Sequence, residues 1–206
     1  MDGFLEPFDL MLSPFCQLGS LAHIYTGVPT RSEQMPGRRC ARQVLSVRAL
    51  DGSRLLSESL IDAVPLSAET EKYVAHAGDV IVPARSTSFG AAILPDDLDG
   101  IVINATLIGI RCGEGLHPRL LAAYLRHPMG RAAIDELSQS GTAQMNITVR
   151  VLANLRLPVP PRDTQERIAR MLEAADAAYD AAVHAADLRH SIANEIVLQA
   201  MTGATI

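Results

Sequence analysis

The spacing of apolar residues along the chain predicts strands and helices of mixed order, followed by one long helix. Residues 44–50 (VLSVRAL) and 80–82 (VIV) are short apolar runs beside the turn pairs Asp-Gly and Gly-Asp, which predicts strands. Residues 101–111 (IVINATLIGIR) are β-branched and aliphatic, so we expect one buried strand there. Since no regular strand-helix-strand repeat follows, the predicted fold class is α+β (irregular α/β).

The second half of the chain changes to helical spacing. Apolar residues recur three and four positions apart over residues 117–137, and Pro128 is expected to break or kink this helix. Residues 155–159 (LRLPV) alternate like an edge strand, where proline is tolerated. Pro160 and Pro161 then disfavour helix at the residues before them, which predicts a boundary between a domain at residues 1–160 and a helix at residues 161–206.

The final segment predicts a coiled-coil helix. Asp163 and Glu166 form a variant of the capping box, and nothing breaks the helix before Thr202-Gly203, so about 39 residues could span about 60 Å. Its apolar seam follows alternating steps of four and three and then shifts register: Ile168, Leu172, Ala175, Tyr179, Ala182 and Ala186, then Leu188, Ile192 and Ile196. Such a helix is unstable alone in water, so it is expected to pair with another helix.

Charge is unevenly distributed over a chain whose formal net charge is −5. Residues 31–54 carry six arginines against two acidic residues: Arg31, Arg38, Arg39, Arg42, Arg48 and Arg54 against Glu33 and Asp51. A local excess of positive charge can bind a polyanion. A solvated loop is the alternative interpretation of this arginine segment.

Other patterns exclude several classes of protein. No apolar window reaches about 18 residues and the first residues do not form a secretory signal, so the expected location is cytoplasmic. Cys16, Cys40 and Cys112 are widely separated, and His184 and His190 lie six apart, so neither a disulfide framework nor a metal site is expected. Nucleotide-binding and hydrolase motifs are absent, so the chain is expected to be non-catalytic and to need no cofactor.

Several segments together resemble a known family. In order and spacing, they are similar to a target-recognition domain and its following helix from the DNA specificity subunit of type I restriction-modification systems. The resemblance covers nearly the whole chain and is weakest over residues 28–75. It is carried by residues 17–27 (QLGSLAHIYTG), 78–90 (GDVIVPARSTSFG), 118–134 (PRLLAAYLRHPMGRAAI), 140–169 and 188–203.

The resemblance implies a function and a set of partners. In that family each recognition domain reads one half of a split target in double-stranded DNA, while the long helices act as spacers and dock DNA methyltransferase subunits. A full-length subunit has two recognition domains and two helices that pair antiparallel, whereas this chain has one of each and looks like a half-subunit. A homodimer would then read two inverted half-sites. Whether another chain reads the second half-site, and whether a restriction/translocase subunit also binds, is left open.

Three stretches are candidates for DNA contacts. The arginine segment offers charge, a loop at residues 85–88 after the strand at residues 80–82 offers polar side chains, and Gln144 and Asn146 match the family's motif. For these two amides, holding the loop ranks first and contacting DNA second. Gln165 is interpreted as structural, at the start of the helix. The candidate DNA-binding residues are Arg31, Arg38, Arg39, Arg42, Arg48, Arg85, Ser86, Thr87, Ser88, Gln144 and Asn146.

Two hypotheses from other classes compete with a DNA specificity subunit. One is a protein-interaction adaptor with a coiled-coil tail that does not read DNA. The other is a cysteine hydrolase, which no local Cys/His pattern supports.

Overall fold

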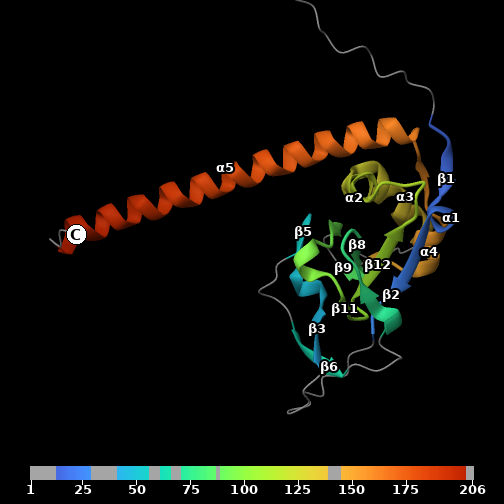
Figure 1. The fold of residues 1–206 in the computed structure, drawn as a ribbon, viewed down its shortest axis with the longest axis horizontal. Helices are drawn as coiled ribbons and strands as arrows, with labels where there is room; N and C mark the ends of the chain where they lie inside the picture. Colours follow the sequence, from blue (N-terminus) through green and yellow to red (C-terminus); the bar gives the residue numbers. More distant parts are fainter. Residues whose placement is uncertain are drawn as a thin grey trace, which may run out of the picture. The chain divides into compact units, whose positions relative to one another are not determined.

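The structure, a computed structural model, describes residues 13–28, 41–55, 61–65, 71–86, 89–138 and 145–202. The chain divides into two compact units, residues 1–165 and residues 166–206. The first unit combines short strands with helices in an irregular order, and the second consists of a long helix (Figure 1). The predicted α+β fold with a long C-terminal helix is therefore confirmed.

A four-stranded antiparallel sheet lies at the centre of the first unit. Its strand order is β10-β8-β12-β2, with β2 at Ala22–Thr26, β8 at Val80–Pro83, β10 at Ala92–Ile93 and β12 at Leu107–Cys112. Val80 and Val82 pack into one apolar cluster and Ile81 into another, as the two-residue period of a strand requires. Both faces of β8 are therefore buried, which explains its uninterrupted apolar sequence.

A second four-stranded sheet, of mixed direction, packs on one face of the first. Its order is β6-β3-β11-β7, with β3 at Ala41–Leu45, β6 at Ile61–Pro65, β7 at Val74–Ala75 and β11 at Ile101–Ile103. The β3 and β11 strands are parallel, and the other pairs are antiparallel. Leu45 and Ile103 of this sheet share an apolar cluster with Ile81 and Leu107 of the first sheet.

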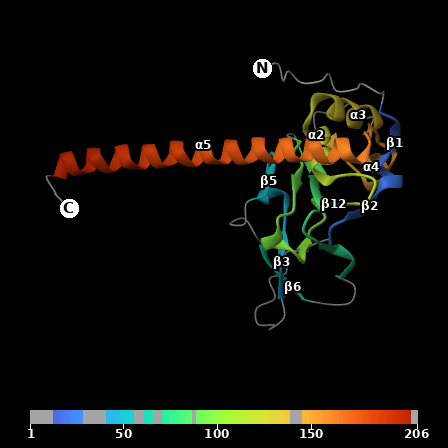
Figure 2. The same ribbon diagram turned by 45° about the horizontal axis from the view of Figure 1, so that its top comes forward.

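Helices pack on the other face of the first sheet (Figure 2). They are α2 at Pro118–Arg126, α3 at Pro128–Ser138 and α4 at Val149–Asn154, beside the short α1 at Leu18–Leu21. The predicted interruption at Pro128 is confirmed, because α2 ends at Arg126 and α3 begins at the proline. Helix α4 was not predicted from the sequence; the hydroxyl of Thr148 caps it by accepting a hydrogen bond from the Val151 amide at 3.2 Å.

Two strand predictions were wrong in their extent. Residues 101–111 form two strands in different sheets, because a turn at Asn104 separates β11 from β12. The predicted strand at residues 44–50 ends at Leu45. The hydroxyl of Ser46 then accepts a hydrogen bond from the Arg48 amide and caps the short helix η1 at Val47–Ala49. Both breaks lie where one polar residue interrupts an apolar run.

The end of the first unit matches the pattern of its sequence. The predicted edge strand is β14 at Arg156–Pro158, which pairs with β1 at Phe15–Gln17 in a two-stranded sheet. Helix α5 spans Arg162–Thr202, 41 residues, which confirms the predicted long helix. Within the described residues, no helix combines the length and the apolar character that crossing a bilayer requires. Two short helices, η3 at Glu71–Tyr73 and η4 at Asp96–Leu98, complete the elements outside the site described below.

Candidate nucleic-acid interface

The structure describes about half of the residues predicted to contact DNA. Arg42 lies in β3, Arg48 in η1, Arg85 and Ser86 in β9 (Arg85–Ser86), and Asn146 in β13 (Met145–Asn146). The remaining candidates lie outside the described residues: Arg31, Arg38, Arg39, Thr87, Ser88 and Gln144.

Two of the predicted segments are neighbours in the fold. Strands β9 and β13 pair antiparallel, with Asn146 opposite Arg85, and the amide of Ile147 donates to the carbonyl of Ala84 at 2.8 Å. Both the Arg85 and the Asn146 side chains are exposed. The prediction that Arg85 and Ser86 lie on a loop was therefore wrong. Their pairing partner comes from a segment far along the chain, and a local pattern cannot reveal it.

A third predicted segment joins this pair through Thr106. The hydroxyl of Thr106 accepts a hydrogen bond from the Val47 amide at 3.0 Å, and its carbonyl accepts one from the Ala84 amide at 2.8 Å. Val47 directly precedes Arg48, and Ala84 directly precedes Arg85. One residue thus links the backbones that carry two candidate arginines.

Thr106 is in turn held by Asn104, a buried residue that is 5% exposed. The side-chain carbonyl of Asn104 accepts hydrogen bonds from both the amide and the hydroxyl of Thr106, and the Asn104 amide donates to the Leu45 carbonyl at 3.0 Å. This arrangement is an Asx-type turn. This turn was not predicted, although the Asn-Ala-Thr triplet inside an aliphatic run is a sequence signal for it.

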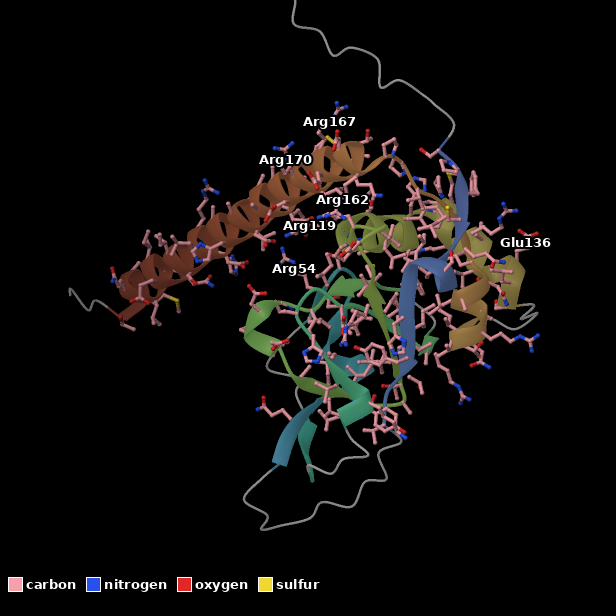
Figure 3. The ribbon with its side chains drawn as sticks, turned by 45° about the vertical axis from the view of Figure 1, so that its right-hand side comes forward. Arg54, Arg119, Glu136, Arg162, Arg167 and Arg170 are labelled. Atoms are coloured by element: carbon pink, nitrogen blue, oxygen red, sulfur yellow. The ribbon has the colours of Figure 1, made fainter. Side chains whose placement is uncertain are left out.

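A tight hairpin follows η1. Strands β4 (Leu50–Asp51) and β5 (Arg54–Leu55) pair around Gly52, whose φ of 56° is left-handed and favours glycine. The Gly52 carbonyl accepts a hydrogen bond from the Ala91 amide at 3.0 Å. A Cβ at Gly90 would lie 2.5 Å from the same oxygen, so this close approach requires glycine. The Arg54 side chain on β5 is exposed (Figure 3).

The chemistry of these exposed groups suits DNA. Guanidinium groups such as those of Arg48 and Arg85 bind phosphate oxygens, and arginine also pairs with the guanine edge. The amide of Asn146 can pair with the adenine edge in the same groove. Because residues opposite each other on antiparallel strands share a face, Arg85 and Asn146 can approach one ligand together.

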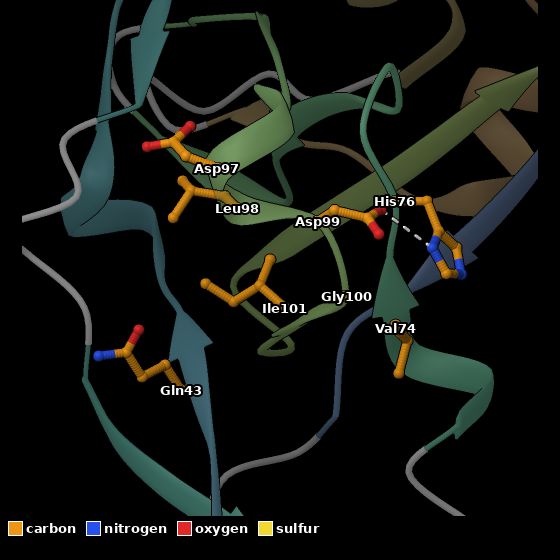
Figure 4. A pocket seen from close by; sticks show the side chains of 8 residues that line it. All are labelled: Gln43, Val74, His76, Asp97, Leu98, Asp99, Gly100 and Ile101. Carbon is orange, nitrogen blue, oxygen red and sulfur yellow. Dashed lines mark hydrogen bonds and ion pairs between the residues drawn. The ribbon is translucent and has the colours of Figure 1, made fainter.

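The open pocket in the second sheet has the opposite character. It has a volume of about 550 Å³ and is lined by Gln43, Asp97 and Asp99 among others (Figure 4). Asp99 accepts hydrogen bonds from the Ala77 amide at 2.9 Å and faces the His76 ring at 3.2 Å, and these contacts hold its pKa below the ordinary value. Its carboxylates would repel phosphate, so this pocket is not the DNA-binding candidate.

An ionic network around the buried Asp79 stabilises the central sheet. The carboxylate of Asp79 accepts hydrogen bonds from the Tyr25 hydroxyl at 2.6 Å and from two guanidinium nitrogens of Arg111 at 2.8 and 2.9 Å. Burial opposes ionisation of Asp79, but the bonds from Arg111, the His76 amide and Tyr25 outweigh it and lower its pKa. A Cβ at Gly109 would lie 2.2 Å from the Tyr25 ring, so glycine there leaves room for the ring. This network joins β2 and β12 to the residue that directly precedes β8.

No group of three or more His, Cys, Asp or Glu side chains that could hold a metal occurs within the described ranges. Burial raises the pKa of the Cys112 thiol to about 12, so this thiol is protonated at neutral pH and is a poor nucleophile.

Gln165 has the structural role that was expected. It is 2% exposed, and its side-chain oxygen accepts a hydrogen bond from the His117 amide at 2.8 Å. Its amide nitrogen donates to the carbonyls of Gly115 and Pro160, both at 3.0 Å. The first turn of α5 is thereby fixed to the start of α2 and to the proline exit.

The apolar seam of α5 is largely exposed within the second unit. Tyr179 is 63%, Ile192 51% and Ile196 59% exposed, while Ile168 and Leu172 are half-buried. The alanines of the seam, Ala175, Ala182 and Ala186, are exposed as well. An exposed apolar stripe of this length is typical of a helix that pairs with another helix.

Comparisons with known proteins point to one family. The family model described as "Type I restriction modification DNA specificity domain" matches residues 63–184, more than half of the chain. The match begins after the arginine segment, within the region where the resemblance is weakest. A comparison with curated protein sequences gave no significant match.

Solved structures share the fold. The HsdS subunit from Thermoanaerobacter tengcongensis aligns with a TM-score of 0.58 at 21% identity, over 86% of this chain and 41% of that one. The S subunit of a type I restriction-modification system from M. genitalium aligns with a TM-score of 0.60 at 14% identity, over 95% and 47%. A chain from a structure of complex assembly in the type I system aligns with a TM-score of 0.62 at 21% identity, over 96% and 47%. This chain thus spans less than half the length of these relatives.

Proposed function

The chain belongs to the type I restriction modification DNA specificity family, and we propose that it reads a DNA sequence and directs a partner DNA methyltransferase to it. In this proposal residues 1–160 form the target-recognition domain, and residues 161–206 form a helix for dimerisation and methyltransferase docking. The chain itself catalyses no reaction, and methyl transfer takes place on the partner subunit.

The observation that carries the proposal is the convergence of three segments around Ala84. Asn146 lies opposite Arg85, and Thr106 bonds the backbones next to Arg85 and Arg48. Recognition of DNA needs phosphate contacts that set the register and base contacts that read the sequence. A convergent set of two arginines and one asparagine offers both.

The proposed assembly follows from the exposed seam of α5. Burying that stripe against the same stripe of a second copy gives a two-fold homodimer, and a two-fold protein reads two inverted half-sites. The methyltransferase, and a restriction/translocase subunit where one is present, would dock on the outer faces of the paired helices.

A protein-interaction adaptor that does not read DNA is the alternative, and selection from random DNA separates the two. The complex of the chain with its methyltransferase subunit would be incubated with duplexes that carry a randomised core, and the bound fraction would be sequenced over several rounds. A reader enriches one bipartite sequence, and an adaptor enriches none.

Charge reversal gives the matched control. Arg85→Glu should abolish the enrichment, whereas Arg156→Glu, which changes an exposed arginine on β14 by the same charge, should preserve it. Equal effects of both substitutions would mean that only the net charge matters and would count against a site at Arg85.

A further inference from the structure

Two arginines from neighbouring helices hold one backbone segment beside the candidate interface. A guanidinium nitrogen of Arg126, the last residue of α2, donates to the Ala91 carbonyl at 2.9 Å. A guanidinium nitrogen of Arg131, in α3, donates to the Phe89 carbonyl at 3.1 Å. These bonds join residues that lie about 35 to 42 positions apart in the sequence.

The close crossing of α2 and α3 brings both arginines to this segment. Pro128 begins the second helix, and a Cβ at Gly130 would lie 2.0 Å from the Tyr124 carbonyl, so the turn requires glycine. The two helices therefore meet at a short distance, with Arg126 before the turn and Arg131 after it.

The segment that they hold is a junction between the candidate DNA-contacting elements. Phe89 is 4% and Ala91 0% exposed. The Ala91 amide donates to the Gly52 carbonyl at the tip of the β4–β5 hairpin, while its carbonyl accepts from Arg126. Ala91 therefore connects α2 to the hairpin that follows Arg48. In the sequence, residues 89–91 come shortly after Arg85.

We propose that Arg126 and Arg131 are positioning residues that fix the hairpin after Arg48 relative to the β9–β13 pair, and thereby set the specificity of DNA reading. This inference rests on the proposed function. Phosphate contacts and base contacts can form together only if the elements that make them keep a fixed spacing.

The position of these two guanidinium groups distinguishes them from arginines that contact phosphate. Arg126 and Arg131 donate to protein carbonyls, so their loss should lower the affinity for the selected sequence and leave non-specific binding unchanged. Loss of a phosphate contact would weaken all sequences alike and reduce the salt dependence of binding by about one counterion.

The test compares Arg126→Gln, Arg131→Gln and the double variant with the parent chain in its methyltransferase complex. Arg156→Gln is the control, since it removes an exposed arginine charge from β14. Arg126→Lys keeps the charge and a hydrogen-bond donor, so it should retain part of the affinity for the enriched duplex that Arg126→Gln loses. The probes are the duplex that the parent protein enriches and a scrambled duplex of the same length, each titrated over a range of salt concentrations.

We expect each Gln variant to lose about tenfold in affinity for the enriched duplex, as removal of one charge-assisted hydrogen bond implies. Binding of the scrambled duplex and the salt slope should stay unchanged. Amide hydrogen exchange should become faster in residues 89–91 and stay unchanged in β8. Unfolding by urea, followed by circular dichroism, establishes that each variant is folded before binding is compared.

Several results would overturn the inference. A salt slope reduced by about one would make these arginines phosphate contacts, and equal losses on both duplexes would make them merely structural. An unchanged exchange rate in residues 89–91 would mean that the segment is held by other contacts. If the parent chain enriches no sequence, the proposed function fails and this inference fails with it. If the parent chain enriches a sequence and the Gln variants bind that duplex as tightly as the parent does, the inference alone fails.

Discussion

Asn146 lies opposite Arg85 on two short antiparallel strands, although the two residues are far apart in the sequence. An amide and a guanidinium are the side chains that pair with adenine and guanine edges in the major groove. Their position on one face of a strand pair makes them the first residues to test by substitution.

We predict that Arg85→Ala and Asn146→Ala affect DNA binding in different ways. Each should weaken binding of the selected duplex by about 1–3 kcal/mol, the value of a good side-chain contact with a base. If Arg85 also contacts phosphate, its loss lowers the salt slope by about one, whereas loss of the neutral Asn146 does not. Fluorescence anisotropy at several salt concentrations measures both effects. Unchanged binding of both variants would remove β9 and β13 from the interface.

Thr106 should be sensitive to loss of its hydroxyl and tolerant of loss of its methyl group. Thr106→Val removes the acceptor for the Val47 amide and a donor to Asn104. It should lower the free energy of unfolding by about 1 kcal/mol and weaken binding of the selected duplex. Thr106→Ser keeps both hydrogen bonds and should behave like the parent chain. Urea unfolding and the same anisotropy assay test this, and equal behaviour of the two variants would contradict the role of the hydroxyl.

Asp79 should make stability depend on acid. Its folded pKa lies below the unfolded value of about 3.9, so its contribution is complete above that pH and is lost as pH falls through the folded pKa. Asp79→Asn keeps the shape but should cost about 1–3 kcal/mol at pH 7, because the hydrogen bonds of Arg111 and Tyr25 to a charged carboxylate are lost. Below pH 4 the free energy of unfolding should therefore fall less in the variant than in the parent chain.

Unfolding by urea at pH 7 and at pH 3 measures both parts of the Asp79 prediction. Asp135→Asn, at an exposed position on α3, is the control and should change stability by less than about 0.5 kcal/mol. A small effect of Asp79→Asn at pH 7 would mean that hydrogen bonds to solvent replace those of the carboxylate with little loss of stability.

Helix pairing can be tested with two alanines of α5. Ala186 lies on the apolar seam, and Ala177 lies nine residues earlier, about half a turn around the helix. Ala186→Glu should convert the proposed homodimer to a monomer, because it places a charge in the paired seam. Ala177→Glu adds the same charge on the opposite face and should leave the dimer intact. Light scattering gives the mass in solution, and a monomeric parent chain would assign the seam to a partner subunit instead.

The local pattern of the sequence was sufficient for the longer helices α2, α3 and α5, but not for the short helix α4. Pro128 divides α2 from α3, and the uninterrupted run after Pro161 gives the 41-residue α5. Helices are predictable in this way because their hydrogen bonds connect residues four apart, so that caps, breaks and apolar spacing all lie in one short window. The long apolar face of α5 is likewise a property of the sequence alone.

Only the tertiary structure decided which strands are neighbours. The turn at Asn104 sends two halves of one aliphatic run into different sheets, and β9 finds its partner in β13. No local pattern in the sequence marks Arg126 and Arg131, because their acceptors are backbone carbonyls on another element. Strand pairing and side-chain contacts with distant backbone join residues at any separation, and no local spacing encodes them. The family resemblance indicated DNA, whereas the convergence of the segments that carry Arg48, Arg85 and Asn146 depends on the fold.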